Sequence, residues 1–258
     1  MNGETLQDLS AYLNWYKTVY GDNIRFDGEF DFSMEVADET ISPVPKAKPE
    51  VKQQVQPKKE FIPRSAKKTF DEQLLHQGNP DLRAFYHEIN KCAKCSLGHT
   101  RTNFVFGMGN PQADIMFIGE APGRDEDMQG LPFVGKAGQL LDKMLFALQM
   151  KREEVYIANV LKCRPPNNRD PLPDEVVHCE PYLKKQIEII KPKVIVALGR
   201  ISAQVLLKKS DSLSMMRQSE HSYENIPFIV TYHPAALLRN PRWKANAWLD
   251  LQKIAKLF

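Results

Sequence analysis

Short apolar runs alternate along most of the chain with stretches in which apolar residues recur at helical spacing. The runs are bounded by turn residues and predict buried strands at residues 114–118, 155–160, 194–198 and 228–231. The helical spacing predicts helices near residues 137–148, 173–190, 203–207 and 243–255. Because strands and helices alternate, we expect an α/β fold with a parallel sheet covered on both faces.

The pattern predicts a single three-layer α/β/α domain at residues 70–258, built on a central, mainly parallel four-stranded sheet. In such sheets the ligand site lies at the carboxyl ends of the strands. The loops expected there carry Glu120 and Ala121 after the first strand, Asn159 and Cys163 after the second, and His233 after the fourth. We therefore expect these polar groups to meet at one edge of the sheet.

The first 69 residues follow a different pattern. Residues 1–33 form an N-terminal extension with apolar residues at the spacing of an amphipathic helix, namely Leu6, Leu9, Leu13, Tyr16 and Tyr20. Residues 34–69 are rich in proline and lysine, with too few large apolar residues to offset the entropy of ordering, so we expect a disordered linker. A docking helix on a flexible tether suggests a protein partner for the N-terminal segment.

Composition excludes a membrane protein and says little about nucleic acid. The chain has 258 residues, 42% of them apolar, and a formal net charge of +3. No stretch approaches the roughly 18 apolar residues of a membrane span, and residues 1–4 do not begin a secretory leader, so we expect a cytoplasmic protein. A charge of +3 permits DNA binding without indicating it, because a polyanion responds to a local patch.

Four cysteines predict a metal or cluster site, since two disulfides are not expected in a reducing compartment. Cys92 and Cys95 form a C-x-x-C pair, and Cys163 and Cys179 follow. Four thiolates suit either tetrahedral zinc or an iron-sulfur cluster. Zinc sites usually have two compact knuckles, whereas the second half here is spread over a loop and a helix start, which favours a cluster. Four unligated buried thiols are the alternative.

The glycine-rich stretch of residues 119–138 follows a predicted strand and is typical of two kinds of site. One is a phosphate cradle, but neither G-x-G-x-x-G nor G-K-S/T is present. The other is a close approach of the backbone to a flat ligand, on which Phe133 can stack. Taken alone, a phenylalanine such as Phe133 is more often part of an ordinary core.

Two polar residues near strand ends are candidates for reading and activating a ligand. The amide of Asn159 offers both a donor and an acceptor, which suits the edge of a base, although turn or capping roles are as common. His233 can donate to a developing oxyanion, although a histidine before a proline is more often structural.

Four stretches of the chain closely resemble family 4 uracil-DNA glycosylases, the iron-sulfur branch of the uracil-DNA glycosylase superfamily. The resemblance runs from about Cys92 to the C-terminus, in family order and with all four cysteines in place. It rests on GEAPGRDEDMQGLPFVGKAGQLL, IANVLKCRPPNNRDPLPDEVVHCEPYL, PKVIVALG and TYHPAALLRNP.

The resemblance implies a fold, a cofactor and a reaction. Cys92, Cys95, Cys163 and Cys179 would hold a 4Fe-4S cluster with a structural role. The protein would bind single- or double-stranded DNA that contains uracil, flip the base into a pocket and hydrolyse its N-glycosidic bond, as in base excision repair. We accordingly expect a monomer associated with the nucleoid.

The resemblance also implies residue roles. Phe133 would stack on uracil, Asn159 would bind its polar edge, and Glu126 would crowd the 5-position and exclude thymine. His233 would face O2 and Glu120 would lie beside the sugar and the attacking water, which makes these two the catalytic pair. Leu237 would fill the gap left by the flipped base, and Arg239 would contact a phosphate.

Two positions depart from the better-known patterns. Ala121 supplies no carboxylate where the aspartate-dependent branch has one, so Glu120 either activates water or only positions it. Gln218 follows Arg217 where the family commonly has glycine, which predicts a local loop difference. The alternative functions are a non-catalytic iron-sulfur DNA-binding or replication-associated protein, and a glycosylase with broader specificity for deaminated bases.

Overall fold

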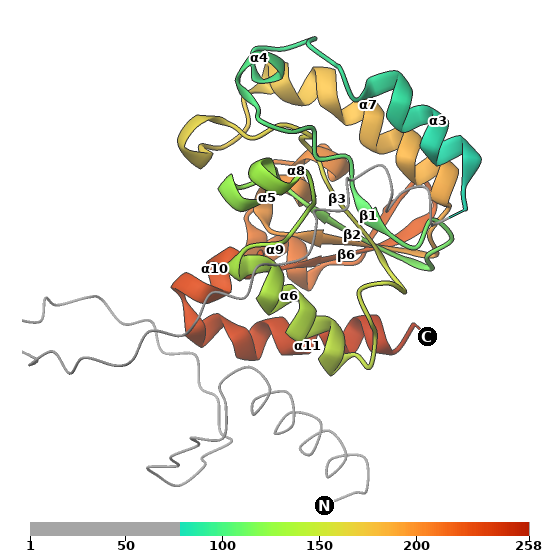
Figure 1. Cartoon of the computed structure of the whole chain (residues 1–258). Helices are drawn as coiled ribbons and strands as arrows, with labels where there is room; N and C mark the ends of the chain where they lie inside the picture. Colours follow the sequence, from blue (N-terminus) through green and yellow to red (C-terminus); the bar gives the residue numbers. More distant parts are fainter. Residues whose placement is uncertain (1–77, 258) are drawn as a thin grey trace, which may run out of the picture.

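The computed structural model describes residues 78–257, which form a sheet flanked by helices (Figure 1). The predicted N-terminal helix of residues 1–33 and the linker of residues 34–69 lie outside the described residues. Within residues 78–257, no helix is both long and apolar enough to cross a bilayer.

The sheet of the described part has six strands, in the order β1-β3-β2-β4-β6-β5. Its strands are β1 (Met108–Gly109), β2 (Ile115–Gly119), β3 (Tyr156–Asn159), β4 (Val194–Leu198), β5 (His221–Tyr223) and β6 (Ile226–Thr231). The four central strands are parallel, as predicted, while β1 and β5 pair antiparallel at the two edges. The expected four-stranded sheet is therefore corrected to six strands, because edge strands of two and three residues are too short to leave a periodic signal.

Successive residues of the central strands point to opposite faces, and each face has its own core. Met116 and Ile118 of β2 pack on one side, while Ile115 and Phe117 pack on the other. Both faces of β2 and β4 are fully buried. Such continuous burial explains why these strands appear in the sequence as unbroken apolar runs.

Helices cover both faces and confirm the three-layer architecture (Figure 1). The first layer includes α3 (Pro80–Ile89), α4 (Leu97–Thr100), α7 (Pro173–Ile190) and α8 (Arg200–Leu207). The second includes α6 (Lys136–Ala147), α10 (Pro234–Arg239) and α11 (Lys244–Ala255). The remaining short elements are α5 (Arg124–Gln129), α9 (Leu213–Gln218) and the 3-10 turns η1 (Pro166–Asn168) and η2 (Pro241–Trp243).

Local signals set several helix starts. Asn79 caps α3, its side chain accepting a hydrogen bond from the backbone N–H of Leu82 at 2.9 Å. In α7, Glu175 accepts from the backbone N–H of Leu172 at 2.8 Å, and Pro173 begins the helix. The helices predicted near residues 137–148, 173–190, 203–207 and 243–255 are present as α6, α7, α8 and α11, with bounds within three residues.

Candidate active site

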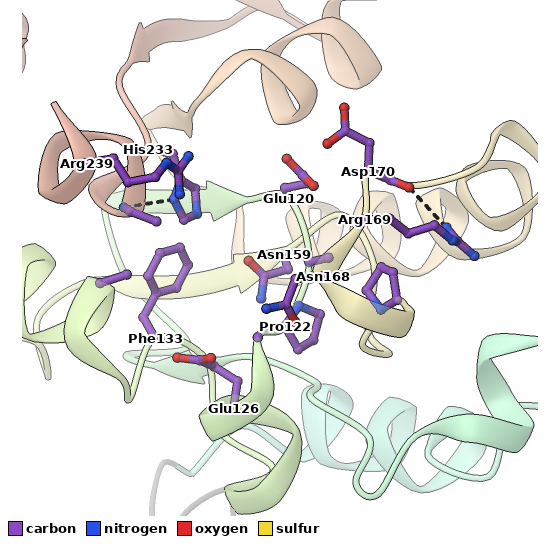
Figure 2. A pocket seen from close by; sticks show the side chains of 15 residues that line it. Glu120, Pro122, Glu126, Phe133, Asn159, Asn168, Arg169, Asp170, His233 and Arg239 are labelled. Carbon is purple, nitrogen blue, oxygen red and sulfur yellow. Dashed lines mark hydrogen bonds between the residues drawn. The ribbon is translucent and has the colours of Figure 1, made fainter. Parts of the chain in front are cut away.

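A cavity of about 310 Å³ opens at the carboxyl edge of the parallel strands. Figure 2 shows side chains from separate segments around it: Glu120 from the loop after β2, Asn159 from the end of β3, Phe133 from the segment before α6, and His233 from the start of α10. The predicted convergence of the strand-end loops is thus observed. The volume lies at the low end of about 300–1,000 Å³ for ligand pockets, which suits a small ring.

The end of β2 must be glycine because two pocket side chains press against it. A Cβ built on Gly119 would lie 2.3 Å from Asn159 Oδ1 and 2.6 Å from Phe133 Cζ. Close approach also holds Phe133 itself, which has a φ of 51°, since a Cβ on Gly138 would lie 1.8 Å from the Phe133 carbonyl oxygen. The glycines of residues 119–138 therefore bring an aromatic ring and an amide together, as the stacking interpretation of this stretch requires.

In the described part of the chain, the side-chain amide of Asn159 has a buried oxygen atom with an unused capacity to accept a hydrogen bond. Asn159 is 2% exposed, and within the described residues its Oδ1 atom has no hydrogen-bond partner. A buried polar atom without a partner costs about 1–3 kcal/mol, so its retention at a cavity wall points to a ligand that donates to it.

His233 is held as a neutral imidazole with a defined proton. Its Nδ1 atom accepts a hydrogen bond from the backbone N–H of Ala235 at 3.1 Å. Burial, aided by the positive charge of Arg239, lowers the pKa of His233 to about 4. At neutral pH the remaining ring proton therefore lies on Nε2, which can act only as a donor. The His233 ring lies 5.4 Å from the Phe133 ring, centroid to centroid.

Glu120 has a carboxyl group that titrates near neutrality. Burial raises its pKa to about 7, with a further contribution from the negative charge of Asp170, while Arg200 and Arg239 oppose the shift. A carboxyl group with such a pKa in a cavity is typical of functional sites.

Glu126, in α5, lines the cavity and connects α5 to the backbone that precedes α6. One carboxylate oxygen accepts from the backbone N–H groups of Val134 at 2.8 Å and Gly135 at 3.0 Å. Gly135 is the N-cap of α6, so the carboxylate also lies at the positive end of that helix. Ala121 lines the cavity too, and adds no charge to it.

The two predicted DNA contacts differ in position. Arg239 is exposed and lines the cavity. Leu237 does not face solvent: it is 1% exposed and belongs to the core between the sheet, α6 and α11. The neighbouring Leu238 is 44% exposed. The helical turn of α10 rotates consecutive side chains by about 100°, so Leu237 faces the core while Leu238 faces solvent. The predicted wedge therefore does not lie at the surface in this structure.

Sequence reasoning missed part of the cavity wall. Asn168, Arg169 and Asp170 line it from the loop at η1. Arg169 contacts the buried carboxylate of Glu175 through both terminal nitrogens, and Asp170 pairs with Arg200 at 3.2 Å. Only the density of polar residues after Cys163 signalled these positions, and it did not distinguish wall residues from an exposed turn.

The four cysteines lie in segments that surround the same region of the first layer. Cys92 and Cys95 lie between α3 and α4, Cys163 follows β3, and Cys179 lies in α7. Burial raises the pKa of Cys163 and raises that of Cys179 to about 12, and negative charge on the neighbouring cysteines raises both further. This mutual influence is expected of thiols gathered at one place.

The surroundings of these sulfurs suit thiolate ligands, because three of them accept hydrogen bonds. Tyr182 donates to Cys92, the Arg101 guanidinium to Cys163, and the backbone N–H of Lys162 to Cys179, each at 3.2 Å. Such bonds favour the negatively charged sulfur of a metal-bound cysteine. Within residues 78–257, no three metal-binding side chains are close enough together to hold a single ion. Four thiols, three of which accept hydrogen bonds, have the donor chemistry of a zinc or iron-sulfur site.

Fold and site together define a class: an α/β protein whose cavity at the carboxyl edge of the sheet is lined by an aromatic ring, a buried amide and an imidazole. Near this cavity lies a cysteine nest, which consists of Cys92, Cys95, Cys163 and Cys179. Comparison with known families agrees with this class. The model of the uracil DNA glycosylase superfamily matches residues 106–252, more than half of the chain. The chain belongs to that superfamily.

Individual relatives narrow the family to its type-4 branch. A type-4 uracil-DNA glycosylase of Archaeoglobus fulgidus is 49% identical over 178 residues, covering 66% of this chain and 89% of the relative. The type-4 uracil-DNA glycosylase of Sulfurisphaera tokodaii is 47% identical, over 68% of this chain and 84% of the relative. The type-4 uracil-DNA glycosylase of Thermotoga maritima is 46% identical, over 59% of this chain and 80% of the relative.

Proposed function

We propose that this protein is a DNA-repair uracil-DNA glycosylase that extrudes uracil from DNA and hydrolyses the bond between its N1 atom and C1' of the deoxyribose. The observation that carries the proposal is the shared cavity of Phe133, Asn159 and His233. A flat aromatic face, an unpartnered amide oxygen and a single N–H donor match the face, the N3–H edge and the O2 atom of uracil.

Base selection follows from the amide. Asn159 Oδ1 accepts from N3–H of uracil, and the amide nitrogen donates to O4. Cytosine presents an acceptor at N3 and a donor at N4, so both pairings become repulsive. Such a reversed polar edge supports discrimination of about 10⁴-fold or more. By the family resemblance, Glu126 is proposed to crowd the 5-position of the base and so to exclude the 5-methyl group of thymine.

Catalysis uses the charges that develop as the glycosidic bond breaks. The electron pair of the bond leaves with uracil, whose O2 becomes negative, while the sugar becomes a cation. The Nε2–H group of His233 donates to O2, and ionised Glu120 stabilises the sugar and positions the water that attacks C1'. Both interactions strengthen in the transition state and so lower the barrier.

The four cysteines are proposed to hold a 4Fe-4S cluster with a structural role. Held by all four thiolates, such a cluster would link the turn after α3, the loop after β3 and α7. The proposed reaction itself uses only protein groups and water.

The remaining proposals concern partners. Arg239 and the exposed Leu238 are proposed to face DNA, Arg239 toward a phosphate and Leu238 toward the gap in the base stack. From the sequence alone, we also propose that the protein works as a monomer inside the cell and that residues 1–33 dock a protein partner. Deletion of residues 1–65 that leaves both activity and complexes in cell extracts unchanged would remove support for the docking role.

The decisive experiment is uracil release by protein purified without oxygen. Oligonucleotides with one uracil, cytosine, thymine or hypoxanthine are incubated with enzyme in excess, and abasic sites are revealed by alkaline cleavage. We expect cleavage at uracil alone, in protein containing about four iron and four sulfide per chain. DNA binding without cleavage would instead indicate a non-catalytic protein, and cleavage at hypoxanthine a broader glycosylase.

A further inference from the structure

Lys162 is a fully buried lysine beside the pocket, with 0% of its surface exposed. It lies three residues after Asn159 and directly before Cys163. Burying an ammonium group without partners costs several kcal/mol, so its contacts should account for its presence.

The ammonium is held by two oxygen acceptors. It donates to the backbone carbonyl of Asn159 at 2.8 Å and to the Oε1 atom of Gln186 at 2.6 Å. Gln186, also 0% exposed, is itself oriented by a hydrogen bond from its Nε2 to the carbonyl of Phe106 at 2.9 Å. The lysine therefore bridges the end of β3 to a rigid position on α7.

The same residue contacts the cysteine nest through its backbone. Its N–H donates to Cys179 Sγ at 3.2 Å. Burial lowers the pKa of the Lys162 ammonium to about 8, and charge on Cys179 and Cys163, when they are ionised, opposes that shift. Lys162 thus touches both the cysteine nest and the strand end that carries the amide.

We propose that Lys162 is a positioning residue for base recognition, which fixes the Asn159 main chain so that its unpartnered side-chain amide meets the edge of uracil. This inference rests on the proposed function. Asn159 is the last residue of β3, and the backbone N–H groups of the two residues that follow still donate to the end of β2 and the loop after it. The Asn159 carbonyl, however, accepts from the lysine, so without the lysine this carbonyl loses that donor and the peptide that carries the amide can tilt. A misplacement of about 1 Å can cost about a hundredfold in rate.

A purely structural role makes a different prediction. If Lys162 serves only as a counter-charge for the thiolates, its loss affects the cysteine nest and the stability of the fold, independently of Asn159. The two roles are separated by a double-mutant cycle, because residues that act through one group have non-additive effects.

The experiment compares wild type, Lys162→Met, Asn159→Ala and the double variant in single-turnover excision of uracil. We expect Lys162→Met to lower the excision rate about tenfold to a hundredfold in the wild-type background. In the Asn159→Ala background, which is already slow, adding Lys162→Met should lower the rate by less than about twofold. Iron content, sulfide content and melting temperature are measured on each variant. Lys185→Met, on the exposed face of α7, is the control and should leave the rate unchanged.

An equal slowing by Lys162→Met in both backgrounds, or wild-type rates in the single variant, would overturn the proposal. Loss of iron in proportion to the loss of rate would also overturn it, in favour of the counter-charge role. If the methionine variant does not fold, Lys162→Gln, whose shorter polar side chain cannot reach both acceptors, enters the same cycle. If the wild-type protein releases no uracil, the proposed function itself fails. If the wild-type protein releases uracil but the effects of Lys162→Met and Asn159→Ala are additive, only the role of Lys162 is rejected.

Discussion

At the scale of single residues, the ring of His233 illustrates how a backbone contact selects a protonation state. Because Nδ1 accepts from Ala235 and burial lowers the pKa to about 4, the imidazole is neutral and its proton is on Nε2. A neutral donor suits a transition state in which negative charge grows at O2, since it needs no prior protonation.

Replacement of His233 by alanine removes this donor. One such donor contributes on the order of 3 kcal/mol to barrier lowering, so excision should slow by hundreds-fold while the melting temperature stays close to that of wild type. Single-turnover kinetics on a uracil oligonucleotide measure the effect, with His178→Ala on the exposed side of α7 as control. A rate near wild type in His233→Ala would remove this residue from the mechanism.

Glu120 predicts a pH dependence whose sign can be worked out. Its raised pKa of about 7 means that the carboxylate needed beside the sugar forms only as the pH rises through that value. His233, with a pKa of about 4, does not titrate in this range. The rate should therefore increase with pH and reach a plateau above about pH 8.

The variant Asp170→Asn tests the cause of that shift. It removes the negative charge that raises the Glu120 pKa and releases Arg200, which lowers it, so the midpoint of the pH–rate profile should move to lower pH. Asp174→Asn, at an exposed position of α7, is the control. An unchanged midpoint in Asp170→Asn would show that Asp170 does not act on Glu120.

At the scale of elements, α5 and α6 are joined by one carboxylate. Glu126 accepts from two backbone N–H groups at the start of α6, directly after Phe133. The contact therefore serves as a cap for the helix and also holds the loop that presents the aromatic ring.

The element-scale prediction is that Glu126→Ala loosens this loop. Loss of a helix cap costs about 1 kcal/mol of unfolding free energy, and uracil excision should fall at the same time because Phe133 is no longer fixed. Glu126→Gln keeps an acceptor and should recover most of the stability, whereas the exposed Glu153→Ala should change neither property. Chemical denaturation and excision kinetics provide the two measurements; full stability in Glu126→Ala would contradict the capping role.

The elements also show which parts of the fold were accessible to sequence reasoning. The sequence predicts the strand at residues 194–198 and the helix at residues 173–190 with their observed bounds, because an unbroken apolar run and a long periodic segment both carry a strong signal. The sequence predicts a loop after Thr231, but residues Pro234–Arg239 form α10, whose helical turn buries Leu237 and exposes Leu238. A helix of six residues is too short to reveal which of two adjacent leucines faces the core.

At the scale of the whole molecule, the cysteines connect segments that are distant in sequence. Cys92 and Cys179 are linked indirectly by Tyr182, which lies one turn after Cys179 in α7 and donates to Cys92. A group bound by all four thiolates would join α7 to the N-terminal part of the described chain and to the loop that carries Lys162.

We predict that removal of iron lowers the melting temperature by more than about 5 °C, because the cross-links it provides are lost and unpaired thiols stay buried. Circular dichroism before and after anaerobic treatment with an iron chelator measures the change, and reconstitution with iron and sulfide should restore the original value. Identical melting curves for the iron-containing and iron-depleted protein would exclude the structural role.

The sequence alone determined the α/β class, the parallel direction of the main strands, and the loops that meet at their carboxyl ends, because apolar periodicity and glycine placement are local properties. Tertiary structure alone decided the proton position on His233 and the raised pKa of Glu120. It also decided that Asp170 lines the pocket and that the Lys162 ammonium donates to the Asn159 carbonyl. These depend on burial and on contacts between segments far apart in the chain. No short stretch of residues encodes such contacts.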